Sequence, residues 1–323
     1  MNWSIETKDL TKRYNELTAV DRLNIAVEQG EIFGLLGPNG AGKTTVLSML
    51  CTMLKPTDGI AEVNGFDIVT QPDEVRKSIG IIFQEPSVDD ELTGLENLQL
   101  HAMWYGVPKG IRRERINEML MLVGLDTRKN DLVKTYSGGM RRRLEIARGL
   151  VHHPKVLFLD EPTLGLDPQT RDQIWNYISD LAKKEEMTIV LTTHYMEEAE
   201  ALCDRVAIID HGRIVVLDTV EKLKKSIGGD LVCLRFSNPN VEVFKSLEYV
   251  KKVELDDDLI VLTVENSSQH LQEILNRAGK VEFISVRPVT LNDVFLHFTG
   301  REIRAETGEG GIFDRIMRVE ARR

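Results

Sequence analysis

The sequence predicts an α/β protein with a largely parallel sheet, followed by a smaller α+β domain. Three observations favour this fold class. Short β-rich runs alternate with helical patterns over the first two thirds of the chain. A glycine-rich loop at 37–45 separates an apolar run from a helical segment. Beyond residue 229 the pattern of elements is β-α-β-β-α-β, the order of a split βαβ, ferredoxin-like unit.

The core sheet is predicted from short runs of apolar and β-branched residues. Two peripheral antiparallel strands are expected at Ile5–Leu10 and Leu23–Val27. The remaining strands are expected at Ile32–Leu36, Ile79–Phe83, Val156–Asp160, Thr188–Thr192 and Arg205–Asp210. Helical patterns follow at Thr44–Leu50, Pro168–Glu185 and Met196–Leu202. Between 86 and 150 strand patterns are missing and helical ones dominate, as at Leu92–Tyr105 and Arg112–Val123, which predicts an inserted α-helical subdomain.

Composition changes divide the chain into three parts. Residues 1–225 form the predicted core domain, and a change near Ser226–Gly229 marks its end. Residues 229–300 carry strand patterns at Leu231–Phe236, Val250–Leu255, Leu259–Val264 and Val281–Val286, and helical patterns at Val241–Leu247, Ser267–Ala278 and Leu291–Phe298. Residues 301–323 are a charged, glycine-containing tail in which Ile312–Met317 is expected to form a short docking helix.

Composition excludes several classes of protein. With 323 residues, 42% of them hydrophobic, the chain can bury a sizeable core. The formal net charge of -10 gives no basic footprint, so a nucleic-acid partner is not expected. Three widely separated cysteines argue against a disulfide framework or structural zinc site and suit a reducing cytosol.

Membrane signals are also missing from the sequence. The start, Met1–Glu6, lacks a basic region followed by an apolar stretch, so no signal peptide is expected. No window approaches eighteen consecutive apolar residues, so no segment is expected to span a bilayer. These features predict a cytoplasmic protein that does not form a membrane path by itself.

The glycine-rich loop matches the phosphate-binding pattern G-x-x-x-x-G-K-[ST]. Its residues are Gly37, Pro38, Asn39, Gly40, Ala41, Gly42, Lys43, Thr44 and Thr45. Glycines let the backbone curl so that successive N–H groups point at a phosphate, and the following helix adds partial positive charge. Lys43 can reach the β- and γ-phosphates, and the Thr44 hydroxyl can ligate Mg²⁺.

A pair of carboxylates follows a second apolar run. Val156–Asp160 is expected to be a buried strand, and Asp160 and Glu161 stand at its end. Asp160 is placed to hold Mg²⁺ through water, and Glu161 to polarise the attacking water as general base. The alternative interpretation is a strand that runs into an acidic turn with no catalytic role. The phosphate-binding loop elsewhere in the chain makes this alternative the weaker one.

With the segment Tyr136–Arg141 the sequence resembles the ATP-binding-cassette (ABC) transporter ATPases. Their signature is commonly Leu-Ser-Gly-Gly-Gln, and this chain departs from it at Tyr136 and Met140. Ser137, Gly138 and Gly139 are the part that meets phosphate at a helix N-terminus. Four further matches carry the family roles: Gln84 as the Q-loop glutamine that contacts Mg²⁺ and water, Leu164–Asp167 as the D-loop, His194 as the switch histidine at the γ-phosphate, and Tyr14 as the aromatic residue that stacks on adenine.

The resemblance covers about residues 1 to 220 and implies ATP and Mg²⁺ as cofactors. It also implies a homodimer, because the phosphate-binding loop and the signature belong to opposite sides of a shared nucleotide and each occurs once here. Pro288–Arg301 looks like the end of ATPases from drug-resistance, ABC-2 type export systems of the daunorubicin-resistance kind. The expected function is therefore to power export of a drug, lipid or other hydrophobic compound through a separate permease, with the subunit peripheral on the inner face of the cell membrane.

Two other functions remain as alternatives. One is a soluble ABC ATPase that acts on DNA or ribosomes, but no sustained heptads separate Gly42 from Ser137, and a second cassette is missing. The other is a nucleotide-sensing regulator whose C-terminal domain binds a ligand. Co-purification with a multi-spanning membrane protein separates transport from both.

Overall fold

The fold is taken from a computed structural model that describes residues 3–84, 87–235, 241–256 and 259–300. The chain divides into two compact units, one up to Leu217 and one from Asp218 onward, and each is described by itself. The predicted core domain extended further, to residue 225. The expected tail at 301–323, with its short docking helix, lies outside the described residues.

A six-stranded sheet forms the centre of the first unit. Its strand order is β11-β10-β4-β9-β8-β7. The strands are β4 (Ile32–Leu36), β7 (Ile79–Ile82), β8 (Val156–Asp160), β9 (Thr188–Thr193), β10 (Arg205–Asp210) and β11 (Arg213–Thr219). The pairs β10–β4, β4–β9, β9–β8 and β8–β7 are parallel, as predicted. Because neighbouring parallel strands end at the same edge, Leu36, Asp160 and Thr193 come together there.

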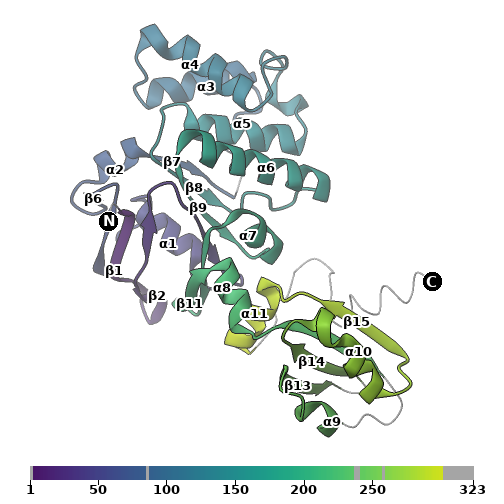
Figure 1. Ribbon diagram of the computed structural model, residues 1–323. Helices are drawn as coiled ribbons and strands as arrows, with labels where there is room; N and C mark the ends of the chain where they lie inside the picture. Colours follow the sequence, from purple (N-terminus) through teal and green to yellow (C-terminus); the bar gives the residue numbers. More distant parts are fainter. Residues whose placement is uncertain (1–2, 85–86, 236–240, 257–258, 301–323) are drawn as a thin grey trace. The chain divides into compact units, whose positions relative to one another are not determined.

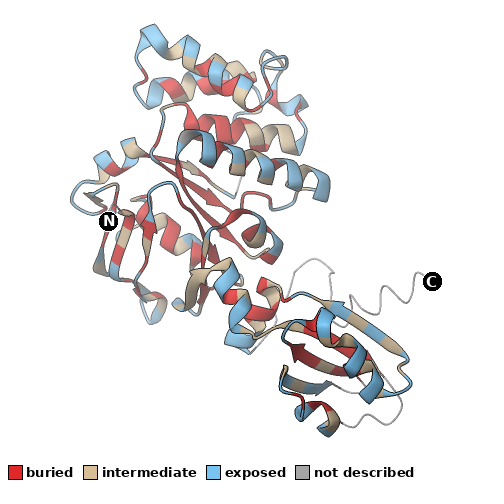
Figure 2. Cartoon of the chain, in the orientation of Figure 1, coloured by how far each residue is buried: buried red, intermediate tan, exposed pale blue. Residues whose placement is uncertain are grey.

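The central strands are buried along their whole length. Every residue of β4, β8 and β9 is buried, which is why these strands are continuous apolar or threonine-rich runs with no polar alternation. Figure 2 shows them as red arrows inside the unit. This burial fixes the strand ends that carry the polar residues of the site.

An antiparallel sheet packs on the other side of helix α1 (Lys43–Leu50). It consists of β1 (Trp3–Tyr14), β2 (Leu17–Leu23), β3 (Ala26–Glu28), β5 (Asp58–Val63) and β6 (Phe66–Asp67). The predicted antiparallel pairing is confirmed, but the single strand expected at Leu23–Val27 is wrong: β2 ends at Leu23 and a separate strand starts at Ala26. One apolar cluster joins both sheets to α1 and includes Phe33, Phe158, Val46 and Val63.

Helices cover the remaining face of the parallel sheet and build the predicted helical subdomain. Helices α5 (Gly138–Leu150) and α7 (Met196–Leu202) contact the sheet, and α6 (Pro168–Glu185) packs on both of them. A short helix, α2 (Pro72–Ser78), precedes β7. The subdomain adds α3 (Gly94–Trp104), α4 (Lys109–Leu122) and a 3-10 turn at Val133–Thr135. Figure 1 shows α3 and α4 side by side above α5 and α6.

The second unit has the predicted split βαβ order. Its elements are α8 (Val220–Ser226), β12 (Asp230–Arg235), α9 (Glu242–Lys245), β13 (Val250–Asp256), β14 (Leu259–Val264), α10 (Ser267–Ala278), β15 (Phe283–Arg287) and α11 (Leu291–Thr299). The four strands form an antiparallel sheet in the order β13-β14-β12-β15. Val232, Ile260 and Leu262 lie in a core of their own with Phe244 and Ile274 of the helices.

Candidate ATP site

The phosphate-binding loop joins β4 to α1 and lies close to the ends of β9 and β10. The amide of Gly37 donates to the carbonyl of Thr193 at 3.3 Å. A Cβ atom on Gly37 would come within 2.3 Å of the carbonyl oxygen of Ile209, so only glycine fits this approach. Gly42, at φ 108°, takes the left-handed conformation that starts α1. The loop therefore curls over the carboxyl edge of the sheet, as the sequence predicts.

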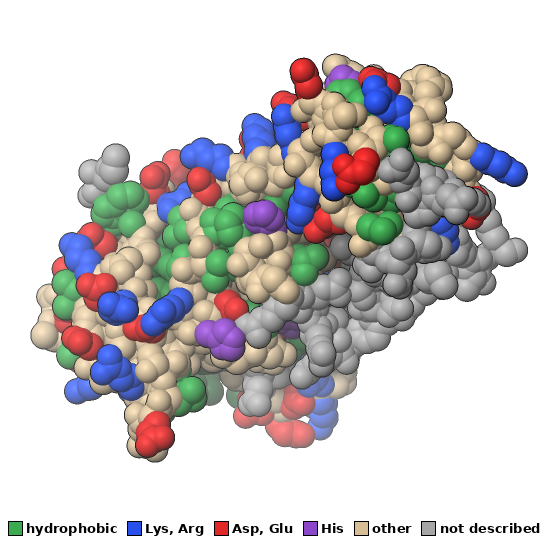
Figure 3. Space-filling model, turned by 90° about the horizontal axis from the view of Figure 1, so that it is seen from below, with side chains coloured by type: hydrophobic (Ala, Val, Ile, Leu, Met, Phe, Trp, Pro, Cys, Tyr) green, Lys and Arg blue, Asp and Glu red, His purple; other side chains and the backbone are tan. Residues whose placement is uncertain are grey.

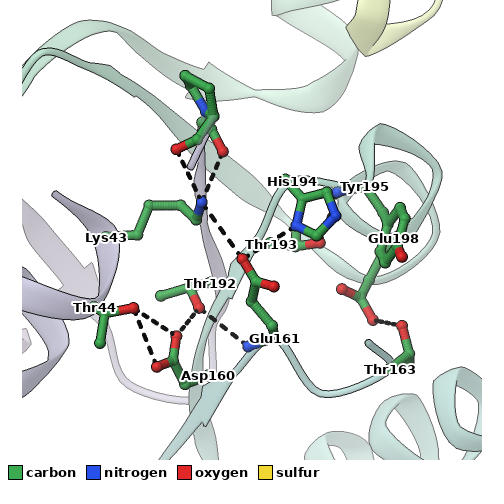
Figure 4. A network of polar contacts seen from close by, with 12 residues as sticks. Lys43, Thr44, Asp160, Glu161, Thr163, Thr192, Thr193, His194, Tyr195 and Glu198 are labelled. Carbon is green, nitrogen blue, oxygen red and sulfur yellow. Dashed lines mark hydrogen bonds and ion pairs between the residues drawn. The ribbon is translucent and has the colours of Figure 1, made fainter. Parts of the chain in front are cut away.

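Lys43, the first residue of α1, reaches back across this loop. Its Nζ donates to the carbonyl oxygens of Gly37 at 2.8 Å and Pro38 at 3.2 Å, and it lies 3.5 Å from Oε1 of Glu161 (Figure 4). Burial lowers the pKa of Lys43, while the negative charge of Glu161 opposes that shift. The ammonium thus stands between the loop carbonyls and a carboxylate, where a phosphate can take over its hydrogen bonds.

Asp160 and Thr44 face each other across the edge of the sheet. The Thr44 hydroxyl lies 3.3 Å and 3.2 Å from the two carboxylate oxygens of Asp160. Thr192 of β9 also donates its hydroxyl to Asp160, and Figure 4 shows the three side chains together. The register between β8 and β9 places Asp160 opposite Thr192. Thr192 was not predicted as a site residue, because one threonine in a β-rich run carries no distinguishing signal.

Glu161 stands in an uncommon backbone conformation directly after β8. Its φ is 47°, and its amide donates to both the carbonyl and the hydroxyl of Thr192 at 3.1 Å. Its Oε1 lies 3.1 Å from Nδ1 of His194. Burial by itself would raise the pKa of Glu161, but the hydrogen bond and charge of His194, with the charge of Lys43, outweigh it and hold that pKa below its ordinary value.

The signature segment, Ser137–Gly139, starts α5 in a different part of the first unit. Ser137 and Gly138 are exposed, and the Ser137 hydroxyl accepts a hydrogen bond from the amide of Met140 at 3.2 Å as an N-cap. A Cβ atom on Gly139 would lie 2.5 Å from Cγ2 of Thr170, so the segment lies directly against the start of α6. Among the described residues, no hydrogen bond joins Ser137 to Lys43, Asp160 or Glu161.

Among the described residues, no hydrogen bond or ion pair joins Gln84 or Tyr14 to this polar cluster. Gln84 is exposed two residues beyond Ile82, which pairs with Leu159 of β8, so it follows the strand next to Asp160. Tyr14 is 45% exposed at the turn between β1 and β2, with the Nζ of Lys12 over its ring at 5.2 Å. The D-loop, Leu164–Asp167, ends where Asp167 caps α6 by accepting from the amide of Thr170 at 3.0 Å.

The residues present fit a nucleotide triphosphate with its metal. The loop offers backbone donors, a helix N-terminus and Lys43 to phosphates. Thr44 and Asp160 offer hydroxyl and carboxylate oxygens, which suit Mg²⁺, an ion that takes its remaining ligands from substrate phosphates and water. The described part of the chain holds no cluster of three or more His, Cys, Asp or Glu side chains of the kind that binds a metal alone. The arrangement can therefore bind and cleave a phosphoanhydride with the metal brought by its substrate.

Two family models match this chain. One, described as ABC transporter, matches residues 20–164, and the other, described as ATP-binding protein DrrA1-3-like, C-terminal domain, matches residues 219–299. The daunorubicin/doxorubicin resistance ATP-binding protein DrrA of Streptomyces peucetius is 41% identical, over 92% of each chain. The linearmycin resistance ATP-binding protein LnrL of Bacillus subtilis is 35% identical, over 93% of this chain and 99% of the relative.

Solved structures share the fold over about two thirds of this chain. The structure of cbiO1 from Clostridium perfringens, part of the ABC transporter complex cbiONQ, superposes with a TM-score of 0.65 at 28% identity, over 70% of this chain and 94% of that one. The ATP-binding cassette MJ0796, solved as a dimer in a post-hydrolysis state bound to ADP and Pi, gives a TM-score of 0.60 at 28% identity, over 67% and 98%. The predicted fold and ATPase activity are thereby confirmed, and the chain belongs to the ABC transporter family as an ATP-binding, ATP-hydrolysing subunit of the drug-resistance exporter type.

Proposed function

We propose that this subunit works as a homodimer in which each ATP lies between the phosphate-binding loop of one protomer and the signature segment of the other. One observation carries the proposal. Lys43, Asp160, Glu161 and His194 form one polar cluster, whereas Ser137 is exposed and, within the described part of the chain, bonded only to its own helix. A two-fold axis supplies the missing signature segment to both sites at once.

Within each site we assign roles by position. The loop amides of 37–45 and Lys43 hold the phosphates, and Tyr14 stacks on the adenine ring. Thr44, Asp160 and Gln84 provide the oxygens for Mg²⁺, which would neutralise phosphate charge when bound. Glu161 accepts a proton from the attacking water, because its lowered pKa keeps it ionised near neutral pH. His194 orients Glu161 and donates to the γ-phosphate.

ATP binding closes the dimer, and hydrolysis lets it open. The γ-phosphate is the one group that contacts Lys43 in one protomer and Ser137 in the other, so its loss removes the bridge between them. The C-terminal unit takes no part in this step, because all assigned phosphate and metal contacts lie before residue 200. We assign it an accessory role that supports dimer formation.

A separate permease would couple this closure to export. Met103 and Trp104 end helix α3 of the helical subdomain and are 57% and 69% exposed, which suits an apolar contact with a partner helix. No helix in the described part of the chain has the length and apolar content needed to cross a membrane. The subunit would then sit on the cytoplasmic face of the membrane, held there by the permease.

The cargo we propose is a drug, lipid or other hydrophobic compound. This rests on relatives whose names state resistance to daunorubicin, doxorubicin or linearmycin, and on one from Ralstonia nicotianae named Nod factor export ATP-binding protein I, 37% identical over 93% of this chain. A nucleic-acid partner is not proposed, since acidic and basic side chains are interspersed on the face shown in Figure 3.

Purification from native membranes with mild detergent tests the transport role. The tagged chain should bring down one multi-spanning membrane protein, and Trp104→Glu should reduce that yield strongly. Ile60→Glu is the matched control, because Ile60 is 54% exposed on the antiparallel sheet and should leave the yield unchanged. Recovery with ribosomes or DNA and without a membrane protein would favour the soluble alternative.

A further inference from the structure

Three charged side chains are buried on one face of α5, the helix that begins at the signature segment. Arg142, Glu145 and Arg148 are spaced three residues apart and are 7%, 2% and 6% exposed. A buried charge is costly unless every hydrogen-bonding group finds a partner. The three side chains therefore require specific acceptors in the surrounding chain.

Arg142 finds an acceptor for each of its five N–H groups. Its Nε donates to the carbonyl of Pro162 at 2.6 Å, and its Nη1 to the carbonyl of Phe83 at 2.7 Å and to Oε2 of Glu145 at 2.9 Å. Its Nη2 donates to the carbonyls of Asp160 and Glu161, both at 3.3 Å. A guanidinium has five donors in a fixed plane, so this pocket is complete only with arginine.

Two of those acceptors are the backbone carbonyls of Asp160, which we assign to Mg²⁺, and of Glu161, which we assign to the attacking water. Glu161 is held from both sides: its amide by Thr192 and its carbonyl by Arg142. Its φ of 47° is a conformation that persists only where neighbouring contacts fix it. Arg142 supplies such a contact from a helix that lies outside the parallel sheet.

The same face of α5 also holds two residues on either side of Gln84 in the sequence, Phe83 and Ser87. Phe83, just before Gln84, accepts from Arg142. Ser87, beyond it, donates its amide to Oε1 of Glu145 at 2.7 Å and accepts from Arg148 at its carbonyl, also at 2.7 Å. Glu145 compensates the charge of Arg142 and so completes the network.

We propose that Arg142 is a positioning residue for ATP hydrolysis: it holds the backbone of Glu161 and ties it to α5 and to Phe83, the residue before Gln84. Movement at Ser137 or at Gln84 is then transmitted to the carboxylate that activates water. This inference rests on the proposed role of Glu161 as the general base. Arg142 touches neither phosphate nor water in this scheme and acts only through Glu161.

Arg142→Lys tests the proposal in the full-length ATPase. Lysine keeps the charge opposite Glu145 but has three donors in place of five, so the Glu161 carbonyl loses its fixed partner. We expect kcat to fall by about tenfold to a hundredfold while KM for ATP stays within about twofold. Arg143→Lys is the matched control, since Arg143 donates to Val123 in the helical subdomain and should keep wild-type kcat.

A second variant separates positioning from charge compensation. Arg142→Gln alone leaves Glu145 buried without its partner, so the double variant Arg142→Gln/Glu145→Gln removes both charges and should melt closer to the wild type. If positioning is the role, its kcat stays as low as that of Arg142→Lys despite the regained stability. Wild-type kcat in either Arg142→Lys or the folded double variant would overturn the proposal.

Measuring Glu161→Gln in the same assay separates failure of the positioning role of Arg142 from failure of the assignment of Glu161 as general base. An inactive Glu161→Gln beside a fully active Arg142→Lys rejects the positioning role and leaves the base assignment intact. An active Glu161→Gln rejects the base assignment itself, and the positioning role with it. The expected result is very slow turnover in Glu161→Gln and reduced turnover in Arg142→Lys, with ATP binding retained in both.

Discussion

Nδ1 of His194 lies 3.1 Å from Oε1 of Glu161, a contact that favours the ionised carboxylate. Burial favours the neutral acid, while His194 and Lys43 favour the carboxylate and outweigh burial. The pKa of the Glu161 carboxyl is thus held below its ordinary value. A depressed carboxyl pKa contributes stability above the unfolded-state pKa, and that contribution is lost as pH falls through the folded-state pKa.

His194→Ala should therefore raise the pKa of Glu161, because it removes the hydrogen bond and charge that lower it and leaves burial in place. The acidic limb of kcat/KM against pH, which reports groups of the free enzyme, should move to higher pH. His194→Asn can keep a donor without a charge and should shift the limb less. An unmoved limb in His194→Ala, whatever the height of the profile, would show that His194 does not control Glu161.

Lys43→Ala should remove ATP hydrolysis and greatly weaken nucleotide binding. Lys43 is the buried ammonium beside the loop carbonyls and Glu161, and loss of one such donor to developing charge costs about a hundredfold to a thousandfold in rate. Lys77→Ala is the control, since Lys77 bonds an exposed Glu74 on α2. Steady-state phosphate release and ATP titration measure both effects, and wild-type turnover in Lys43→Ala would reject the site.

Ser137→Arg should impair turnover while ATP affinity of the monomer stays nearly unchanged. In one protomer Ser137 caps only α5, and a lost cap costs about 1 kcal/mol of stability. Thr93→Ala controls for this cost, because Thr93 caps α3 in the same way and carries no proposed role in ATP binding. Affinity is measured at a protein concentration too low for dimers. A matching loss of affinity there would place Ser137 beside the nucleotide of its own chain.

Asp293→Asn should destabilise the C-terminal unit without changing the chemical step. The Asp293 carboxylate receives both Nη groups of Arg287 at 2.7 Å and also caps α11 through the amide of Thr290 at 2.9 Å. Loss of the charge should lower the melting temperature of this unit. Turnover at high protein concentration should match the wild type and fall more steeply on dilution. A lower kcat at saturating protein concentration would contradict the accessory role.

The sequence predicts those parts of the site whose residues are neighbours in the chain. The loop at 37–45 and the pair Asp160–Glu161 each form within one turn or strand end, so short patterns reveal them. Thr192 and Arg142 escape prediction, because Asp160 lies 32 residues from Thr192 and the backbone carbonyls that Arg142 binds lie 18 to 59 residues from it. Arg142 also stands between two other arginines, a pattern typical of a solvated helix face, yet it is buried.

For the fold too, the strands whose own residues determine them are predicted, and the strands that depend on pairing with distant residues are not. Continuous apolar runs such as Ile32–Leu36 predict buried parallel strands, and these agree with the structure. The strand Asp58–Val63 was not predicted, because it contains Gly59 and alternates buried with exposed residues, and its pairing with β1 is what makes it a strand. Leu23–Val27 was misread as one strand, since the break between β2 and β3 depends on separate pairings with β1.

The mass of Glu161→Gln in the presence of ATP and Mg²⁺, measured by light scattering, tests the shared site most directly. This variant should bind ATP and hydrolyse it very slowly, because Glu161 no longer accepts the proton while Asp160 is intact. We predict a stable dimer with ATP and a monomer without it, and Glu161→Gln/Ser137→Arg should stay monomeric under both conditions. A Glu161→Gln protein that remains monomeric with saturating ATP, or a double variant that still dimerises, would contradict the claim that each ATP lies between two protomers.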